Sequence, residues 1–322
     1  MHIYWFKDSK AGHLKQVNVL LNRLKQELKF SLISIDLSKG KNSLRDIKSI
    51  ASSINEANQP VIFIGAGHSV YSKIVDSKKI LKKNFNKQAI SIAILRPSSN
   101  IKSFDLICAP KHDFNNRKVP DNVITFQGAL ASPSYTPVDK NKGVIAIGGH
   151  SKHYKFNEEI LMKHLHYILS VHPNYEFKIF NSRRTPNSIN LNIKDEISKY
   201  ENVHFIDFHD PLSNSFEDNI QKSALKFVTP DSANLVFEAL SSKGNTYLIQ
   251  IENPKYRKIF GSKKIRNSIN ELIESKRVGL VYYIQKEGMD ISKIENPSED
   301  FEPLAEVEKI ACSIKKFLNS NQ

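Results

Sequence analysis

The chain has 322 residues, of which 40% are apolar and 25% are charged. This length predicts two domains, and this balance is typical of a globular protein with a full core. Its two cysteines, Cys108 and Cys312, lie far apart and without zinc-ligand spacing. The sequence therefore argues against a disulfide framework and a structural metal, and it favours a reducing compartment.

The beginning of the chain does not resemble a targeting segment. The apolar run His2–Phe6 is interrupted by Lys7 and Asp8, far short of the apolar region of a signal peptide. No stretch approaches the ~20 apolar residues that span a bilayer. We therefore expect a cytoplasmic protein that is not an integral membrane protein.

The formal net charge is +14 at pH 7. A nucleic acid, an anionic membrane surface or a phosphorylated substrate would each suit such a charge. A general compositional bias explains it equally well, because the lysines are spread along the chain, as at Lys78–Lys79 and Lys263–Lys264. No recognised nucleic-acid motif accompanies the charge, so we expect no nucleic-acid partner.

Short β-branched runs alternate with helical periods in the first half, which predicts parallel strands with crossover helices. The first helix is the clearest, because apolar residues recur every three or four positions from Val17 to Leu28. The expected strands of this half are His2–Phe6, Leu32–Leu37, Pro60–Gly65, Ala89–Leu95, Asp105–Cys108 and Asn122–Thr125.

The pattern lapses over Ser132–Lys142, where two prolines and a polar run predict a linker. Helices are then expected near Glu158–Val171, Asp231–Ser241, Lys264–Glu274 and Leu304–Leu318. The second set of expected strands is Gly143–Ile147, Glu176–Phe180, Val203–Asp207, Leu225–Val228, Asn245–Ile251 and Gly279–Tyr283. The chain thus predicts one domain over residues 1–135, a second over 143–302, and a final helical segment over 303–322 able to pack back on the first domain.

The segment Asp8–His13 follows the first strand directly and precedes the first helix. Gly12 lets the backbone turn tightly, and amides at the start of a helix favour an anion. His13 would lie at the carboxyl edge of the sheet, where open α/β folds bind ligands. It is therefore a candidate general base toward a hydroxyl, with a histidine that only packs on the loop as the alternative.

A second glycine turn, at Gly65 and Gly67, ends the strand that starts at Val61. The third glycine of a dinucleotide fingerprint is missing, so the evidence for bound NAD is weak. The turn instead suits the acceptor side of a cleft. His68 fits a solvated residue at a helix start.

In the second half, the strand Gly143–Ile147 ends in Gly148 and Gly149. Glycine amides with no Cβ in the way are able to cradle a phosphate. Ser151 and Lys152 would add a hydroxyl and a positive charge. An ordinary strand-to-helix turn is the alternative.

Two arginines, Arg183 and Arg184, follow the next strand and precede Pro186, which suits a helix start. Guanidinium groups bind phosphate oxygens bidentately, so this pair suits a diphosphate. A surface charge run is the alternative.

Asp231 and Ser232 lie where another helix is expected to begin, and they suit N-cap roles as well as ligand contacts. Glu238 follows two turns later on the same face of that helix. A carboxylate there is able to accept both hydroxyls of a ribose.

Together these segments resemble the plant mitochondrial-fission (elongated-mitochondria) family and its bacterial relatives, which are described as glycosyltransferases, some of them from lipooligosaccharide outer-core loci. The order and spacing of the pieces carry the resemblance over nearly the whole chain. The matching residues are Asp8, Lys10–His13, Gln16, Gly65–Gly67, Phe104–Asp105, Ala109–Pro110, His112–Asp113, Gly128–Leu130, Gly148–Gly149, Ser151, Tyr154, Ser182–Pro186, Thr229, Asp231–Ser232 and Glu238–Ala239.

The resemblance implies a GT-B-like α/β fold, in which two Rossmann-like domains face each other across a cleft. The first domain would bind the acceptor through Lys10, Gly12, Gly65, Gly67 and His68. The second would bind a nucleotide-sugar through Gly148, Gly149, Ser151, Arg183, Arg184, Thr229, Asp231, Ser232 and Glu238. A more distant resemblance, to the glycosyltransferase that makes lipid II, favours His13 as the catalytic base.

The implied reaction is an inverting sugar transfer that needs neither metal nor cofactor. Its acceptor would be a glycan or glycolipid hydroxyl in bacterial cell-surface polysaccharide or lipopolysaccharide biosynthesis. The basic surface would then hold the enzyme at the anionic inner face of the cytoplasmic membrane. Two alternatives remain open, a non-catalytic recruitment protein on the same fold and a nucleotide-sugar epimerase. The epimerase generally needs NAD, and no full fingerprint for it is present.

Overall fold

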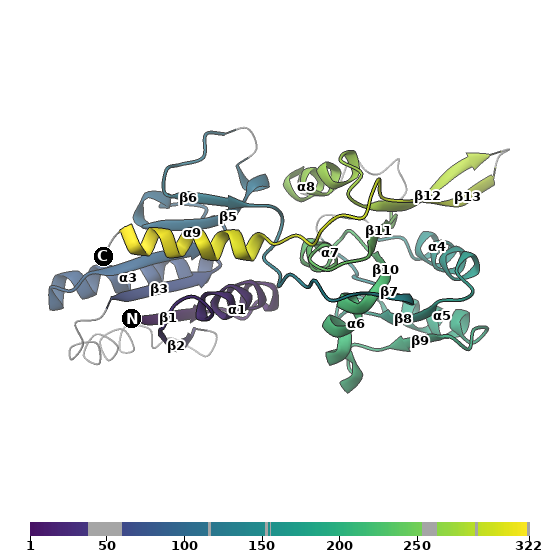
Figure 1. The fold of residues 1–322 in the computed structure, drawn as a ribbon, viewed down its shortest axis with the longest axis horizontal. Helices are drawn as coiled ribbons and strands as arrows, with labels where there is room; N and C mark the ends of the chain where they lie inside the picture. The colour runs from purple at the N-terminus through teal and green to yellow at the C-terminus, as the bar shows by residue number, and fades with distance from the viewer. Residues whose placement is uncertain are drawn as a thin grey trace. The chain divides into compact units, whose positions relative to one another are not determined.

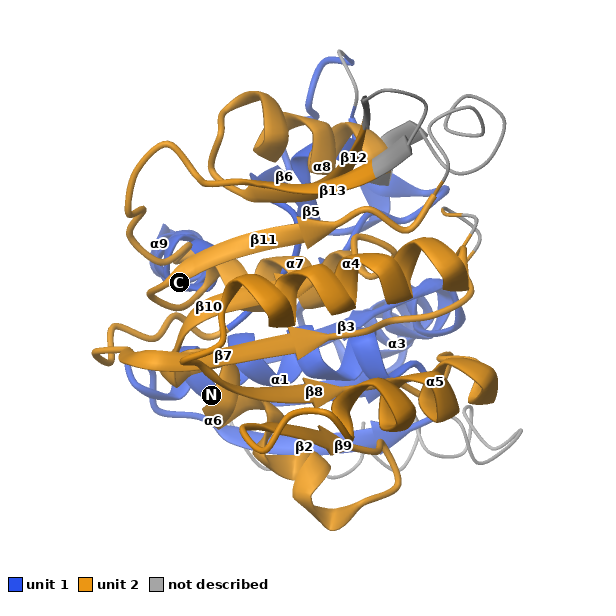
Figure 2. Ribbon diagram, turned by 90° about the vertical axis from the view of Figure 1, so that its right-hand side faces the viewer, with its two compact units in different colours: residues 1–131, 306–322 blue, residues 132–305 orange. Residues whose placement is uncertain are grey.

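The computed structural model describes residues 1–37, 60–114, 117–151, 154, 156–252, 263–286 and 289–320. It divides into two compact units (Figures 1 and 2). Unit 1 comprises residues 1–131 and 306–322, and unit 2 comprises residues 132–305. Among the described residues, no helix combines the length and the apolar character needed to cross a bilayer.

Unit 1 contains a six-stranded sheet in which every neighbouring pair is parallel, in the order β2-β1-β3-β4-β5-β6. All six strands expected from the sequence are confirmed. They are β1 (His2–Lys7), β2 (Ser31–Asp36), β3 (Val61–Ala66), β4 (Ala89–Ile94), β5 (Leu106–Pro110) and β6 (Val123–Phe126). The helices of this unit are α1 (Ala11–Lys25), α3 (His68–Phe85) and α9 (Glu306–Ser320), with short 3-10 turns at Ile101–Ser103 and Lys111–Asp113.

Alternate residues of the central strands point to opposite faces of this sheet. Ile3 and Trp5 pack with α1 and α9, whereas Tyr4 and Phe6 pack with α3. Both faces are therefore covered, which explains why the strands are continuously apolar.

Helix α9 brings the end of the chain back to unit 1. Its buried residues include Val307, Ile310 and Ile314, which share one core with α1. At its first residue, the Glu306 carboxylate accepts a 2.8 Å hydrogen bond from the Gln127 backbone N–H, just after β6.

Unit 2 contains a seven-stranded sheet in the order β13-β12-β11-β10-β7-β8-β9, in which only the β12–β13 pair is antiparallel. Its strands are β7 (Asp139–Ala146), β8 (Glu176–Phe180), β9 (Val203–Ile206), β10 (Ser223–Val228), β11 (Asn245–Ile249), β12 (Gly279–Lys286) and β13 (Met289–Glu295). Its helices are α4 (Glu158–Val171), α5 (Asn187–Ile197), α6 (Phe216–Lys222), α7 (Ala233–Leu240) and α8 (Lys263–Glu274), with a 3-10 turn at Pro211–Ser215.

Two details of unit 2 differ from the sequence prediction. The expected linker is wrong at its end, because β7 already begins at Asp139 and pairs there with Ser223 of β10. These first residues are exposed and polar, and backbone pairing does not need apolar side chains. Strand β13 was not predicted, because its sequence contains no continuous apolar run. It pairs with β12 along its whole length, from Met289 to Glu295.

The strand order of unit 2 reverses between β7 and β10. From β7 the chain moves outward to β8 and β9, and then it returns to the other side for β10, β11 and β12. Crevices at the carboxyl ends of strands that flank such a reversal are the usual ligand sites of open α/β sheets. Residues 147–149 and 229–232 lie at this point.

Candidate functional sites

A carboxylate and an imidazole form a close pair at the carboxyl end of β1. Asp8 Oδ2 lies 2.7 Å from His13 Nδ1, and Asp8 Oδ1 accepts a 3.1 Å hydrogen bond from the Lys10 backbone N–H. The Asp8 side chain is 7% exposed and that of His13 is 21% exposed. A carboxylate accepts hydrogen bonds, so Nδ1 carries a proton, and in the neutral form of the ring Nε2 keeps its lone pair. This arrangement suits a general base.

The turn after β3 lies directly against this pair. Gly67 has a φ of 104°, and a Cβ placed on it would lie 2.6 Å from both Asp8 Oδ2 and His13 Nδ1. Only glycine fits that conformation and that space. At Gly65 a Cβ would come within 2.7 Å of the Phe6 carbonyl oxygen. These two glycines therefore let the β3–α3 turn approach the end of β1.

Of the residues predicted for the acceptor side, Gly67 lies against His13, and Lys10, Gly12 and His68 lie near it in the chain or beside Gly67. Lys10 is the N-cap residue of α1, and the half-buried Gly12 precedes His13. His68 begins α3 next to Gly67 and is exposed. Asp8 had no predicted role. Its signal in the sequence was its place just after a strand and five residues before a histidine.

A second polar cluster lies at the reversal point of unit 2. Thr229 Oγ1 accepts from the Gly148 N–H at 2.8 Å and donates to Asp231 Oδ1 at 2.6 Å. Asp231 Oδ2 accepts from the Gly149 N–H and from Arg184 Nη2, both at 3.0 Å. These contacts join the ends of three strands, β7, β8 and β10. We call these five residues the β7–β10 network.

Asp231 is the centre of this network. Its side chain is 0% exposed, whereas that of Arg184 is 43% exposed. Burial raises the pKa of Asp231, although the Thr229 hydroxyl, the Gly149 N–H and the Arg184 guanidinium act in the opposite direction. Arg184 Nη1 also donates to the His150 carbonyl oxygen at 3.0 Å. The hydrogen bonds to Asp231 and to the His150 carbonyl oxygen therefore fix the orientation of the Arg184 guanidinium.

The glycines of this network have a steric role. A Cβ on Gly148 would lie 2.2 Å from the Asp231 carboxylate, and one on Gly149 would lie 2.0 Å from the Arg184 carbonyl oxygen. We expected their amides to be free for a phosphate. That expectation is wrong, because both amides already donate to side chains of the turn after β10.

The predicted capping of α7 is also wrong. Ser232 is the N-cap residue, yet its side chain makes no capping hydrogen bond. The Asp231 carboxylate points into the network instead. The start of α7 is thus left without a side-chain cap.

A cavity of about 330 Å³ opens beside this network. Of the predicted donor residues, it brings together Gly148, Arg184, Ser232 and Glu238. Ser232 and Glu238 lie on one face of α7, with Leu235 between them. The other lining residues include Asn181 and Ser182, which directly precede the predicted arginine pair, and Phe208, Asn214 and Phe216, which sequence reasoning missed. Several of them lie at or after the carboxyl ends of β8 and β9. Because open α/β sheets bind ligands at the carboxyl ends of strands near a reversal of strand order, their positions could have been predicted once that order was known.

The remaining predicted donor residues do not line this cavity. Thr229 and Asp231 are buried within the network. The exposed Arg183 holds its guanidinium 5.9 Å from the centre of the Phe208 ring. Ser151 Oγ accepts a 3.3 Å hydrogen bond from the Tyr154 N–H, and Lys152 lies outside the described residues.

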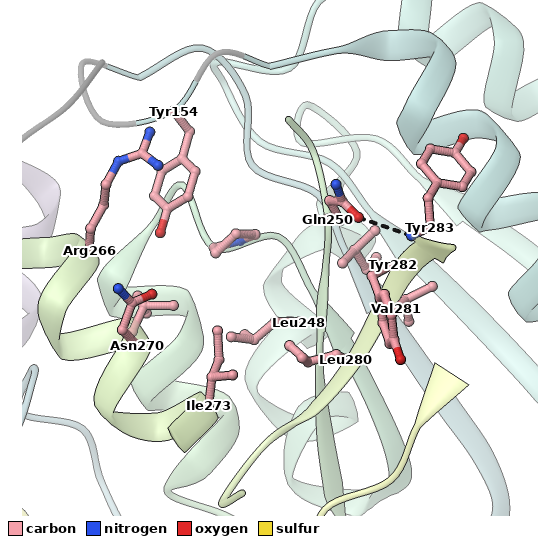
Figure 3. A pocket seen from close by; sticks show the side chains of 13 residues that line it. Tyr154, Leu248, Gln250, Arg266, Asn270, Ile273, Leu280, Val281, Tyr282 and Tyr283 are labelled. Atoms are coloured by element: carbon pink, nitrogen blue, oxygen red, sulfur yellow. Dashed lines mark hydrogen bonds between the residues drawn. The ribbon is translucent and has the colours of Figure 1, made fainter. Parts of the chain in front are cut away.

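A further cavity of about 300 Å³ lies between α8 and strands β11 and β12 (Figure 3). Its base is apolar, with Leu248, Ile273 and Leu280. At its rim Arg266 forms two hydrogen bonds of 3.0 and 2.9 Å with Glu252 and lies 4.6 Å from the centre of the Tyr154 ring. None of the predicted site residues lines it, so we regard the cavity beside the β7–β10 network as the candidate donor site.

Within the ranges that the structure describes, no three His, Cys, Asp or Glu side chains come together as a metal site would require. Metal independence remains a prediction of the sequence.

A family model described as mitochondrial fission ELM1 matches residues 11–318, which include parts of both units. The chain belongs to the mitochondrial fission ELM1 family. The ELM1 match contains His13, the β7–β10 network and Glu238, while Asp8 lies just before it. The family resemblance inferred from the sequence motifs is thereby confirmed.

A curated relative, the uncharacterized protein RP120 of Rickettsia prowazekii, is 26% identical over 206 residues. The match covers 62% of this chain and 54% of the relative, so the chain spans about half the length of that protein.

Solved structures of two UDP-GlcNAc 2-epimerases have the same fold. The enzyme of Methanocaldococcus jannaschii is 9% identical, with a TM-score of 0.53, and the match covers 98% of this chain and 99% of the other. The enzyme of Neisseria meningitidis, solved bound to UDP-GlcNAc, is 15% identical, with a TM-score of 0.51 and coverage of 99% and 100%. At these identities the likeness concerns the fold alone. It confirms the predicted GT-B-like pair of Rossmann-like units.

Proposed function

We propose that this protein transfers a sugar from a nucleotide-sugar donor to a hydroxyl of a glycan or glycolipid acceptor. The Asp8–His13 pair is the observation that carries this proposal. The buried Asp8 carboxylate oxygen lies 2.7 Å from His13 Nδ1 and accepts its hydrogen bond. This contact orients the ring, so that Nε2 of the neutral imidazole would be able to accept a proton. Unlike the exposed His166–Glu196 pair, this pair has a carboxylate that is only 7% exposed and lies at the carboxyl end of a strand.

In the proposed reaction, His13 Nε2 removes the proton of the acceptor hydroxyl. The oxygen then attacks the anomeric carbon of the donor, and the bond from that carbon to the nucleotide breaks, with its electron pair leaving on the diphosphate. Asp8 stabilises the imidazolium that forms. A single displacement of this kind inverts the anomeric carbon and needs no metal or cofactor.

The donor side of the proposal rests on the cavity in unit 2. Arg184 and the uncapped start of α7 at Ser232 would offset the charge that grows on the leaving diphosphate. Glu238, on the same cavity wall, would accept the ribose hydroxyls. Gly148, Gly149, Thr229 and Asp231 would act as positioning residues, because their polar groups are already used to hold Arg184 and the turn.

Two predicted donor residues keep a more peripheral place in the proposal. Arg183 would meet the diphosphate from outside the cavity, since it is exposed and adjacent to Arg184. Ser151 would contribute a hydroxyl beside Gly149.

We also propose that the net charge of +14 holds the enzyme on the anionic inner leaflet, where a lipid-linked acceptor would be elongated. Liposome co-sedimentation tests this role. Binding should increase with the fraction of anionic lipid and fall with salt. Binding that ignores lipid charge would refute it.

Transfer itself is tested in two steps with the purified full chain. A thermal-shift screen against UDP, GDP, CMP and their common sugars identifies the donor, because a bound ligand stabilises the folded state. Release of the nucleotide from that donor is then measured with and without acceptor glycans. The proposal predicts release that depends on the acceptor and is lost in His13→Gln, while donor binding persists.

A nucleotide-sugar epimerase is the second candidate, because the two solved structures described above, which share this fold, are epimerases by name. Incubation of the donor alone separates the two functions. Conversion of the sugar without any acceptor, followed by NMR, would favour the epimerase. If no nucleotide binds at all, the non-catalytic recruitment role suggested by the family name gains support.

A further inference from the structure

A second polar pocket lies in unit 1, between α3 and the loop that follows β4. Its volume is about 330 Å³, within the range of small-molecule sites. We call it the α3 pocket. Its polar lining comes from Ser72, Asp76 and Lys79 on the helix and from Ser99, Asn100 and Ser103 on the loop.

The loop of this pocket has an unusual backbone. Leu95 has a φ of 70° and Asn100 a φ of 56°. A left-handed conformation is costly for leucine, and such strain persists only where the surroundings enforce it. Here the Tyr71 hydroxyl lies 2.7 Å from the Ile94 carbonyl oxygen and 3.0 Å from that of Leu95. Burial raises the pKa of Tyr71, which keeps this hydroxyl a donor.

The floor of the pocket is aromatic and fixed. The Tyr71 ring packs edge-on against Phe104 and against His68, at centroid distances of 5.7 and 5.8 Å. His68 Nδ1 also lies 3.4 Å from Ser98 Oγ of the loop. Contacts of Tyr71 and His68 therefore hold α3 against the loop, and the polar side chains of the rim take no part in this.

Those polar groups are unused. Within the part of the chain that the structure describes, the side chains of Ser72, Asp76, Lys79, Ser99, Asn100 and Ser103 have no hydrogen-bond partner in the protein, and all but Ser103 are exposed to solvent. They comprise hydroxyls, an amide, one carboxylate and one ammonium, so the charged groups of the rim cancel. Such neutrality is notable in a chain with a net charge of +14. A phosphate site would present guanidinium groups or glycine amides instead.

The pocket adjoins the Asp8–His13 pair through the chain itself. His68 lines the pocket, and the preceding residue, Gly67, lies against Asp8 and His13. A ligand held in the pocket therefore lies on the α3 side of the proposed base.

We propose that the α3 pocket recognises the sugar unit of the acceptor, and that this unit is neutral and rich in hydroxyls rather than phosphorylated. The inference rests on the proposed function and specifies its acceptor class. Mixed donors and acceptors around a closed aromatic floor match the hydroxyls of a sugar. With Asp76 and Lys79 balancing each other, the rim offers no excess positive charge to an anionic group.

NMR titration of the isotope-labelled full chain tests this site. The probes are methyl glycosides of neutral hexoses and N-acetylhexosamines, with glucose 6-phosphate as the charged counterpart. At least one neutral glycoside should shift amide signals of residues 68–79 and 97–103. A response only to the phosphate, shifts confined to other residues, or no response to any glycoside would overturn the proposal.

The variant Asn100→Gly removes the rim amide and keeps the left-handed backbone that glycine tolerates. Combined with Ser99→Ala, it should weaken glycoside binding by about tenfold, since two hydrogen bonds are lost. Asn86→Gly is the matched control, because Asn86 has a φ of 50° at the opposite end of α3. Equal weakening in the control would show that helix stability, not the pocket, sets the affinity.

The same spectra separate this inference from the proposed function. UDP, GDP and CMP should shift signals of unit 2 residues such as Arg184 and Glu238. A glycoside that binds the α3 pocket without any nucleotide binding would refute the transferase and retain the sugar site. Nucleotide binding without a glycoside response would refute the sugar site alone.

Discussion

The polar side chains at the carboxyl edges of the two sheets are used in opposite ways. In unit 2, the side chains of Thr229, Asp231 and Arg184 are bonded to one another or to the Gly148 and Gly149 amides. In unit 1, Asp8 pairs with His13, and Tyr71 and His68 also have partners, whereas the rim of the α3 pocket, from Ser72 to Ser103, is left unpaired among the described residues. Polar groups that are hydrogen-bonded to one another keep one geometry, whereas polar groups that bind only water are able to bind a ligand in its place. Substitutions should therefore damage stability in unit 2 and recognition in unit 1.

The largest effect is expected on the rate in unit 1. His13→Gln should lower the transfer rate by about 10²- to 10⁴-fold, because a positioned general base contributes that much. Donor binding should stay unchanged in a thermal-shift assay. His166→Gln is the control, since His166 forms a similar 2.8 Å pair with Glu196 on the surface of unit 2. A full rate in His13→Gln would remove the base from the mechanism.

Asp231→Ala should cause the largest loss of stability. It would leave the Gly149 N–H and the Thr229 hydroxyl unpaired in a buried place, which costs about 2 to 5 kcal/mol of unfolding free energy. Asp76→Ala, at the exposed rim of the α3 pocket, should change that free energy by less than about 0.5 kcal/mol. Urea denaturation of both variants measures the contrast, and equal losses would refute it.

Arg184→Ala should lower turnover by roughly a hundredfold, as expected for the loss of one preorganised charge at a leaving group. Its partner Asp231 is fully buried, so the loss of this charge-assisted hydrogen bond should also lower the unfolding free energy, by about 1 to 3 kcal/mol. Arg183→Ala provides the comparison and should have the smaller kinetic effect, because Arg183 does not line the cavity. Steady-state kinetics with saturating donor decide the order.

Gly67→Ala sharpens the comparison within unit 1. The added Cβ would press on Asp8 and His13, so transfer should fall together with a stability loss of about 1 to 3 kcal/mol. Gly128→Ala imposes a similar backbone strain at a φ of 68°. If Gly128→Ala reduced the rate as much as Gly67→Ala, the close approach to His13 would have no catalytic meaning.

The last prediction concerns the pH dependence of stability and a buried lysine of unit 2. Lys226 Nζ donates to the Ala239, Ser242 and Lys243 carbonyl oxygens at 2.5 to 2.8 Å, at the end of α7. Burial nevertheless lowers the pKa of Lys226 from 10.5 to about 7. The unfolded chain therefore binds more protons between pH 7 and 10.5, and stability rises with pH over that window.

The expected slope for Lys226 is at most about 1.4 kcal/mol per pH unit. Lys226→Met should remove it, which is measured as the difference in unfolding free energy between the two proteins at pH 7, 8.5 and 10. Parallel curves would show that Lys226 keeps its ordinary pKa in the fold.

The sequence by itself determined the kind and order of most of the elements, although α6 and β13 were not predicted. Buried strands such as β3, and the three- and four-residue period of α1, are local patterns, because each follows from the residues of one segment. The same holds for the glycines that mark turns and for His13 after the first strand.

Only the tertiary structure decided which polar groups meet. Gly149 and Asp231 are 82 positions apart, and they pair because the sheet places β7 beside β10. Because β7 lies beside β10, the Gly148 and Gly149 amides, which were expected to bind phosphate, donate to side chains of the protein. The Asp231 carboxylate binds there and not at the start of α7, and β7 begins within the expected linker. The tertiary structure also shows that Asp8 pairs with His13. The spacing of five residues does not by itself determine the direction of either side chain. Local patterns fix what each segment forms, whereas hydrogen-bond partners depend on strand order, which no single segment encodes.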